Sequence, residues 1–81
     1  MTTHTMHQEN GYFFWVTGVQ LKTGKWDAYV YFERVADHDG QKEFVPCMRT
    51  TLKGGWASRQ EAETVAKVEA FKMAADGNTG L

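Results

Sequence analysis

Histidine, cysteine and acidic side chains are the residues of this chain whose types and spacing could support chemistry. His4 and His7 have the spacing of two metal ligands one helical turn apart. They stand in a polar, aperiodic N-terminal segment, and two ligands without a third partner bind a metal ion weakly. His38 belongs to a distant turn and is not expected to join them. We therefore predict no metal site and no cofactor.

Nucleophilic and calcium-binding chemistry are also weakly supported. Cys47 has no base beside it in the sequence, and a lone cysteine is more often a small hydrophobe than a nucleophile. Asp37, Asp39 and Glu43 resemble the start of a calcium loop, but the later ligands and the closing glutamate are missing. Acidic residues at this spacing are typical of turns. The sequence therefore predicts a protein that is not an enzyme.

The segment before the last predicted element is the best candidate for binding an anion. Arg49, Lys53 and Arg59 surround a glycine pair and Trp56, close to a predicted helix start. Free N–H groups at a helix start attract phosphate, and a tryptophan can stack on a base. In the alternative interpretation the segment is an ordinary loop with Trp56 in the core. Weak DNA or RNA binding through Arg49, Lys53, Trp56 and Arg59 is our alternative functional hypothesis.

Composition narrows the class of protein and its compartment. The 81 residues suffice for one domain, and 42% hydrophobic with 23% charged residues is typical of a folded globule. A net charge of −1 lacks the basic excess of a dedicated nucleic-acid binder, so a nucleic acid is the less favoured partner. A single cysteine cannot form an intramolecular disulfide, which favours the cytoplasm. The longest apolar run, Tyr12–Val16, is too short to cross a membrane, and the N-terminus does not resemble a signal peptide.

A first hairpin is predicted from aromatic and β-branched residues. Residues 1–10 are expected to form a disordered tail, and residues 11–76 a single domain. Strands are predicted over Tyr12–Leu21 and Trp26–Val35, because these residues suit a pleated, half-buried surface. Lys22–Lys25 between them contains a glycine and is predicted to be the turn.

The register of this hairpin follows from keeping one face apolar. Placing Lys22 opposite Lys25 gives a consistently apolar face, whereas a slip by one residue sets Trp15 opposite Tyr31 and mixes the faces. We therefore predict the face toward the core to consist of Trp15, Thr17, Val19, Leu21, Trp26, Ala28, Val30 and Phe32.

A third strand is predicted over Gln41–Thr50, after an Asp39-Gly40 turn. Pro46 lacks an N–H, so the strand should lie at a sheet edge or carry a bulge, which a meander permits. Its inward face stays undecided between two sets, Phe44 with Met48 and Val45 with Cys47.

The chain is predicted to end in a helix from a capping box at Ser58 and Glu61 to about Ala75, with Gly77 as the stop and residues 77–81 frayed. The face toward the sheet is predicted to hold Ala62, Val65, Ala66, Glu69, Ala70 and Met73, with Glu69 at its margin. The predicted fold class is α+β: a three-stranded antiparallel meander packed on one C-terminal helix.

Aromatic residues remain on the surfaces that this fold leaves uncovered. The predicted outer sheet face carries Tyr12, Phe14, Tyr29 and Tyr31, and the outward side of the helix carries Phe71. Such rings either stiffen the hairpin or form an association surface, and Phe71 is alternatively at the edge of a rolled helix. Our leading hypothesis is a non-enzymatic binding or self-associating module that contacts a protein partner or a second copy (a homodimer) through this aromatic face.

Residues Gly55–Ala66, after three predicted strands, resemble the glycine, aromatic, Ser/Thr and Glu-Ala segment of AP2-type and integrase N-terminal domains. The resemblance implies a three-stranded sheet packed on a helix, with DNA bound by the sheet face. DNA-binding members are arginine-rich on that face, whereas Asp27 and Glu33 occupy the predicted outer face here. We therefore carry over the fold but not the function.

Overall fold

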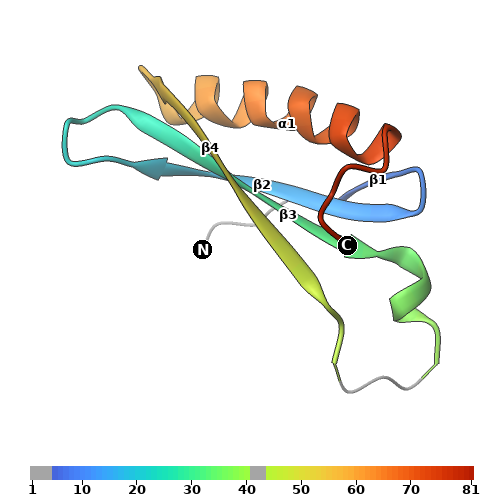
Figure 1. Cartoon of the computed structure of the whole chain (residues 1–81). Coiled ribbons are helices and arrows are strands. Elements are labelled where there is room, and N and C mark those ends of the chain that lie inside the picture. The colour runs from blue at the N-terminus through green and yellow to red at the C-terminus, as the bar shows by residue number, and fades with distance from the viewer. Residues whose placement is uncertain (1–4, 41–43) are drawn as a thin grey trace.

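The fold is one antiparallel sheet with a single α-helix on one of its faces. The computed structural model of the chain describes residues 5–40 and 44–81. Within them four strands lie in consecutive order, with the 3-10 helix η1 (Val35–His38) after the third: β1 (His7–Glu9), β2 (Tyr12–Gln20), β3 (Trp26–Arg34) and β4 (Cys47–Trp56). Helix α1 (Arg59–Ala75) follows and lies along one face of the sheet (Figure 1). The α+β class and the meander are confirmed, but the sheet has four strands and not three.

Strand β1 is the strand that the sequence analysis missed, in a segment expected to be a tail. It pairs with β2, with His7 opposite Phe14. The connecting residues Asn10 and Gly11 have φ of 50° and 82°. Two consecutive residues with positive φ form the tight hairpin turn that an Asn-Gly pair favours. The Asn10 Nδ2 group also donates to the carbonyl oxygen of Ala74 at 2.9 Å, which ties this turn to the end of α1.

The predicted register of the β2–β3 hairpin is wrong by one residue. Trp15 lies opposite Tyr31, the pairing rejected above. The physical reason is the turn: Leu21 N–H donates to the Lys25 carbonyl at 2.8 Å, which closes a loop of three residues and not two. Gly24 takes the positive φ, 87°, that such a loop requires. The extra loop residue reverses the predicted faces of β2 and leaves the inward set of β3 as predicted: Trp26, Ala28, Val30 and Phe32.

Strand β4 lies further along the chain than the predicted strand Gln41–Thr50: it begins at Cys47 and includes residues 51–56. Residues 41–43, with Glu43 among them, lie outside the described residues. Pro46 precedes β4, and β4 is an edge strand as expected. Met48 pairs with Phe32 and Cys47 with Glu33, which settles the inward face of β4 in favour of Met48.

A bulge interrupts β4 near its end. Residues Ala28 and Trp26 of β3 pair with Leu52 and Trp56, so β4 carries extra residues there. Gly55 takes φ of 59°, and its N–H donates to Asp27 Oδ1 at 3.1 Å. The bulge turns the strand toward the start of the helix.

Helix α1 begins and ends where the sequence indicated. The Ser58 hydroxyl accepts from the Glu61 N–H at 3.1 Å, and beyond the last turn Gly77 has φ of 71°. Asn78 N–H donates to the Met73 carbonyl at 2.8 Å, the bond of a Schellman-type stop.

The face of α1 toward the sheet is narrower than predicted. The fully buried residues of the helix are the four alanines Ala62, Ala66, Ala70 and Ala74. Val65 is 41% exposed and was wrongly assigned to the buried face, whereas Glu69 is exposed beside the groove next to β4, in keeping with its predicted place at the margin. The small alanine side chains let the helix axis approach the sheet closely. Because the alanines recur every four residues, they form a single row along one side of the helix.

Tyr12 and Phe14, which were expected to point outward, and Phe71, which was predicted either outward or at the helix edge, all lie in the core or against it. Phe14 is fully buried, because the shifted register turns it toward the helix. Phe71 is half-buried and meets the Phe14 ring edge-on at a centroid distance of 4.7 Å. Tyr12 is half-buried beside Phe32. The core thus uses Phe14, Phe32 and Val30 with the helix alanines.

The C-terminal residues also pack, although they were expected to fray. Thr79 is 2% exposed and Leu81 lies against the core. Helix α1 is the one α-helix in residues 5–40 and 44–81, and no helix in those ranges is long and apolar enough to cross a membrane.

Candidate functional site

The sheet face opposite α1 is the candidate site, and we call it the open face. Figure 1 shows α1 on one side of the sheet only. The strand register places on the open face the side chains of Phe13, Trp15, Thr17, Val19, Asp27, Tyr29, Tyr31, Glu33, Cys47, Arg49 and Thr51. No helix or strand of the described residues covers these side chains.

Aromatic rings from two strands dominate the open face. Trp15 and Tyr31 are direct cross-strand partners, and their rings stack at 5.2 Å with an interplanar angle of 4°. Tyr29 meets Tyr31 edge-on at 6.3 Å. All three side chains are half-buried. The result is a ridge of aromatic surface across the middle of the sheet, with its outer edges in contact with solvent.

A basic group from β4 borders this ridge. The Arg49 guanidinium lies over the Tyr29 ring, 4.5 Å from its centroid. Lys53, at the start of the bulge, is exposed and lines the space between β4 and α1 instead. A guanidinium held against a ring keeps its remaining N–H groups available to an incoming anion.

The acidic residues of the open face are engaged with the protein itself. Asp27 is 9% exposed and accepts the Gly55 N–H. Glu33 is bonded to His38, with 3.1 Å between Oε1 and Nε2. Both carboxylates of the open face are therefore hydrogen-bonded within the chain itself.

One corner of the open face contains the only thiol of the sequence. Cys47 is the cross-strand partner of Glu33. Partial burial, and then the nearby Glu33 carboxylate, raise the pKa of the Cys47 thiol, so at neutral pH the thiol is less ionised than usual. The ring of His38 meets Phe13 edge-on at 5.0 Å, which attaches helix η1 to the same corner.

The structure separates the predicted partner-binding residues. Tyr29 and Tyr31 lie on the open face as expected. Tyr12 and Phe14 face the helix, and Phe71 packs on Phe14. The open face gains Trp15 and Phe13 in their place. Both follow from the three-residue loop at Gly24, which sets the register of β2 on β3.

The predicted nucleic-acid residues are also divided between two sides of the sheet. Arg49 borders the aromatic ridge and Lys53 lines the groove between β4 and α1, whereas Trp56 packs against the core and Arg59 lies over the Trp26 ring at 5.3 Å. The strand-to-helix segment therefore does not gather its cations and Trp56 into one cluster.

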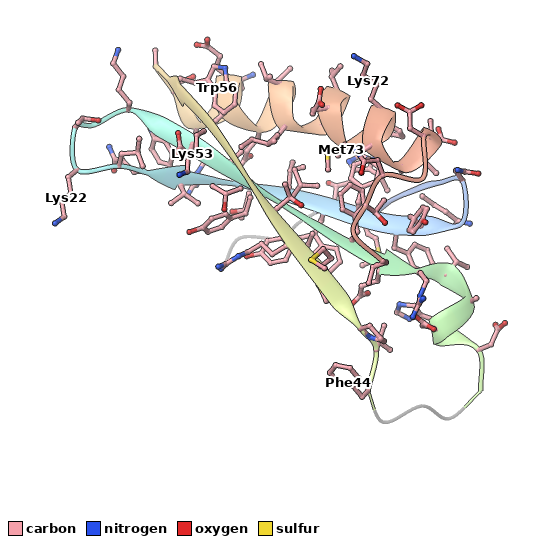
Figure 2. The ribbon with its side chains drawn as sticks, in the orientation of Figure 1. Lys22, Phe44, Lys53, Trp56, Lys72 and Met73 are labelled. Atoms are coloured by element: carbon pink, nitrogen blue, oxygen red, sulfur yellow. The ribbon has the colours of Figure 1, made fainter. Side chains whose placement is uncertain are left out.

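A second depression lies between β4 and α1. This open groove has a volume of about 470 Å³ and is lined by Thr51, Leu52, Lys53, Gly54, Trp56, Val65 and Glu69. Figure 2 shows Lys53 and Trp56 on the C-terminal half of β4, next to the start of the helix. The lining of the groove is mainly apolar, and its charged groups are Lys53 and Glu69.

The metal-ligand pattern of the N-terminus is not assembled in the part of the chain that the structure describes. His4 lies outside the described residues, and His7 stacks on Phe14 at 5.0 Å and lies against Phe71. Within residues 5–40 and 44–81 no three His, Cys, Asp or Glu side chains are grouped so that they could hold a metal ion.

Comparison with known proteins identifies no relative: no family model, no curated protein and no solved structure matches this chain. The resemblance to AP2-type and integrase N-terminal domains therefore stays a prediction.

Proposed function

We propose that this chain is a non-enzymatic binding module whose ligand surface is the open face of the sheet, with a protein as its partner. The observation that carries the proposal is the stacked Trp15–Tyr31 pair, extended by Tyr29, on a sheet face that no described helix or strand covers. A reducing, cytoplasmic setting fits its exposed free thiol at Cys47.

The composition of the open face supports a binding role over a purely structural one. Cross-strand aromatic pairs stabilise a sheet by only about 0.2–1 kcal/mol each, a modest gain for a domain this small. A solvated sheet face ordinarily carries polar side chains. Tyrosine, tryptophan and arginine are the residues that provide most of the binding energy at protein interfaces, and Tyr29, Tyr31, Trp15 and Arg49 adjoin one another here.

A single-stranded nucleic acid is the second candidate ligand, and a specific observation favours it. Arg49 lies over Tyr29 on the ridge that carries the rings, so stacking groups and a cation occur on one surface. Nonspecific single-strand binding uses this combination. The candidate site thus moves from the strand-to-helix segment to the open face.

Site-specific photo-cross-linking in cells tests the proposal. A photoreactive phenylalanine replaces Tyr29 on the open face, and a matched control replaces Gln60, which is exposed at the start of α1. We expect a discrete protein adduct from position 29 and none from position 60. Adducts of equal yield from both positions, or none from position 29, would overturn the proposal.

The nucleic-acid candidate is separated from the protein candidate by a titration. A ten-residue oligothymidine is added at low salt, and the tryptophan fluorescence of the wild type is compared with that of Arg49→Ser. Binding that weakens steeply with salt and with Arg49→Ser supports a nucleic-acid ligand. No change at low salt removes it.

A further inference from the structure

A row of exposed residues runs along α1 outside its buried alanine face, with Val65 also lining the groove beside β4. Glu61, Val65, Val68 and Lys72 follow one another at spacings of four, three and four, which places them on one stripe of a helix. Val65 is 41% and Val68 62% exposed, and Figure 2 shows Lys72 projecting away from the sheet. We call these four residues the helix stripe.

The helix stripe is complementary to a second copy of itself that runs in the opposite direction. If a second α1 lies antiparallel against the first, with the two-fold axis between residues 66 and 67, Val65 meets Val68 of the other copy. The same axis places Glu61 beside Lys72 of the other copy, at both ends of the contact. An isologous interface requires this kind of reciprocal pairing. In the described part of the chain neither Glu61 nor Lys72 forms a side-chain ion pair within its own molecule.

We propose that two copies of this chain associate through the helix stripe in an antiparallel helix pair. Two apolar contacts flanked by two ion pairs then join helix to helix, and each sheet lies on the outside. The open faces point away from each other, so the dimer presents two binding surfaces on opposite sides. The inference is independent of what the open face binds.

The contact is small and the association is correspondingly weak. Each copy contributes two valines, which are already partly buried, and exposed ion pairs add little. The cost of association consumes most of this gain, so we expect a dissociation constant of about 0.1–1 mM. Two copies of the chain that are held close together on one ligand would dimerise more completely, because their effective concentration is higher.

Charge reversal at the helix stripe tests the proposal by sedimentation equilibrium at protein concentrations up to about 2 mM. Lys72→Glu makes both terminal pairs repulsive and should raise the dissociation constant roughly tenfold. Glu61→Lys should do the same. The double variant Glu61→Lys/Lys72→Glu restores opposite charges across the axis and should return the constant to within roughly threefold of the wild type.

The controls separate this contact from general charge effects and from the open face. Lys67→Glu makes the same charge change on another side of α1 and should leave association unchanged. Val68→Asp should abolish association, with far-UV circular dichroism confirming the fold. A wild type that is monomeric at 2 mM, or a double variant as weak as the single ones, overturns the proposal. Dimers that survive Val68→Asp but are lost in Trp15→Ser would show that association uses the open face.

Discussion

Replacing Phe14 by alanine should destabilise the protein far more than replacing its neighbour Trp15. Phe14 is fully buried, and its ring contacts the rings of Phe71 and Phe32 at centroid distances of 4.7 and 5.9 Å. Removing a buried phenylalanine costs about 3–5 kcal/mol in lost burial and a residual cavity. Trp15 is half-buried and loses chiefly its stack on Tyr31, which is worth about 0.5–1.5 kcal/mol beyond its area.

The loss of unfolding free energy expected for Phe14→Ala is large relative to the total stability of the protein. A chain of this length is expected to have a free energy of unfolding of about 4–12 kcal/mol, so Phe14→Ala removes much of it. Urea unfolding followed by far-UV circular dichroism measures both variants without depending on Trp15 fluorescence. Phe14→Leu, expected to cost only about 1–1.5 kcal/mol, provides a folded reference if the alanine variant does not fold.

The comparison also decides the register of the β2–β3 hairpin. A slip by one residue would place Trp15 in the core and Phe14 on the open face. If Trp15→Ala costs as much as Phe14→Ala, or more, the three-residue turn and the assignment of the open face are wrong.

Three further changes probe the bulge, the first turn and the thiol. In Gly54→Ala the new Cβ would overlap the Trp56 indole, so we expect a loss of about 1–3 kcal/mol in urea unfolding and a changed tryptophan emission; an unchanged spectrum would contradict the bulge geometry. Asn10→Gly keeps the positive φ but loses two side-chain bonds to carbonyls at the end of α1 and should cost about 0.5–1.5 kcal/mol in thermal unfolding; no loss would mean that the turn is not anchored there. Glu33→Gln removes the charge that helps to raise the pKa of Cys47, so a thiol reagent should modify Cys47 faster at pH 7.5 than in the wild type. An equal or slower rate would show that the carboxylate does not act on the thiol.

The elements with local signals were predictable from the sequence. Ser58 and Gly77 mark the ends of α1 through their own hydrogen bonds and φ. The inward set of β3 alternates cleanly, and Pro46 correctly indicates a strand at the edge of the sheet. These signals depend on a few neighbouring residues and need no knowledge of the rest of the fold.

The faces of β2 were not predictable from hydrophobicity, because residues 12–16 are apolar on both sides of the strand. In such a strand the alternation gives no preference, and the turn decides. The choice between a two- and a three-residue loop at Gly24 therefore moved Phe14 into the core and Trp15 out of it. The Asn10-Gly11 pair was a readable hairpin signal that would have revealed β1.

The candidate site was predicted only in part for the same reason. Tyr29 and Tyr31 belong to β3, whose facing was correct, and they remain on the open face. Arg49 joins them as the cross-strand partner of Tyr31, on a strand whose inward face the sequence left undecided. No pattern within a single segment could have brought Trp15, Tyr31 and Arg49 together.

Hydroxyl-radical footprinting tests most directly whether the open face is the binding surface. Oxidation of Trp15 and Tyr31 is measured by mass spectrometry on the purified protein at low micromolar concentration and on the same protein in its native cell extract. Phe44, which is 75% exposed and lies outside the strands, serves as the internal reference. We predict that oxidation of Trp15 and Tyr31 falls several-fold in the extract while that of Phe44 stays constant. Equal oxidation of all three residues in both samples would contradict a binding role for the open face.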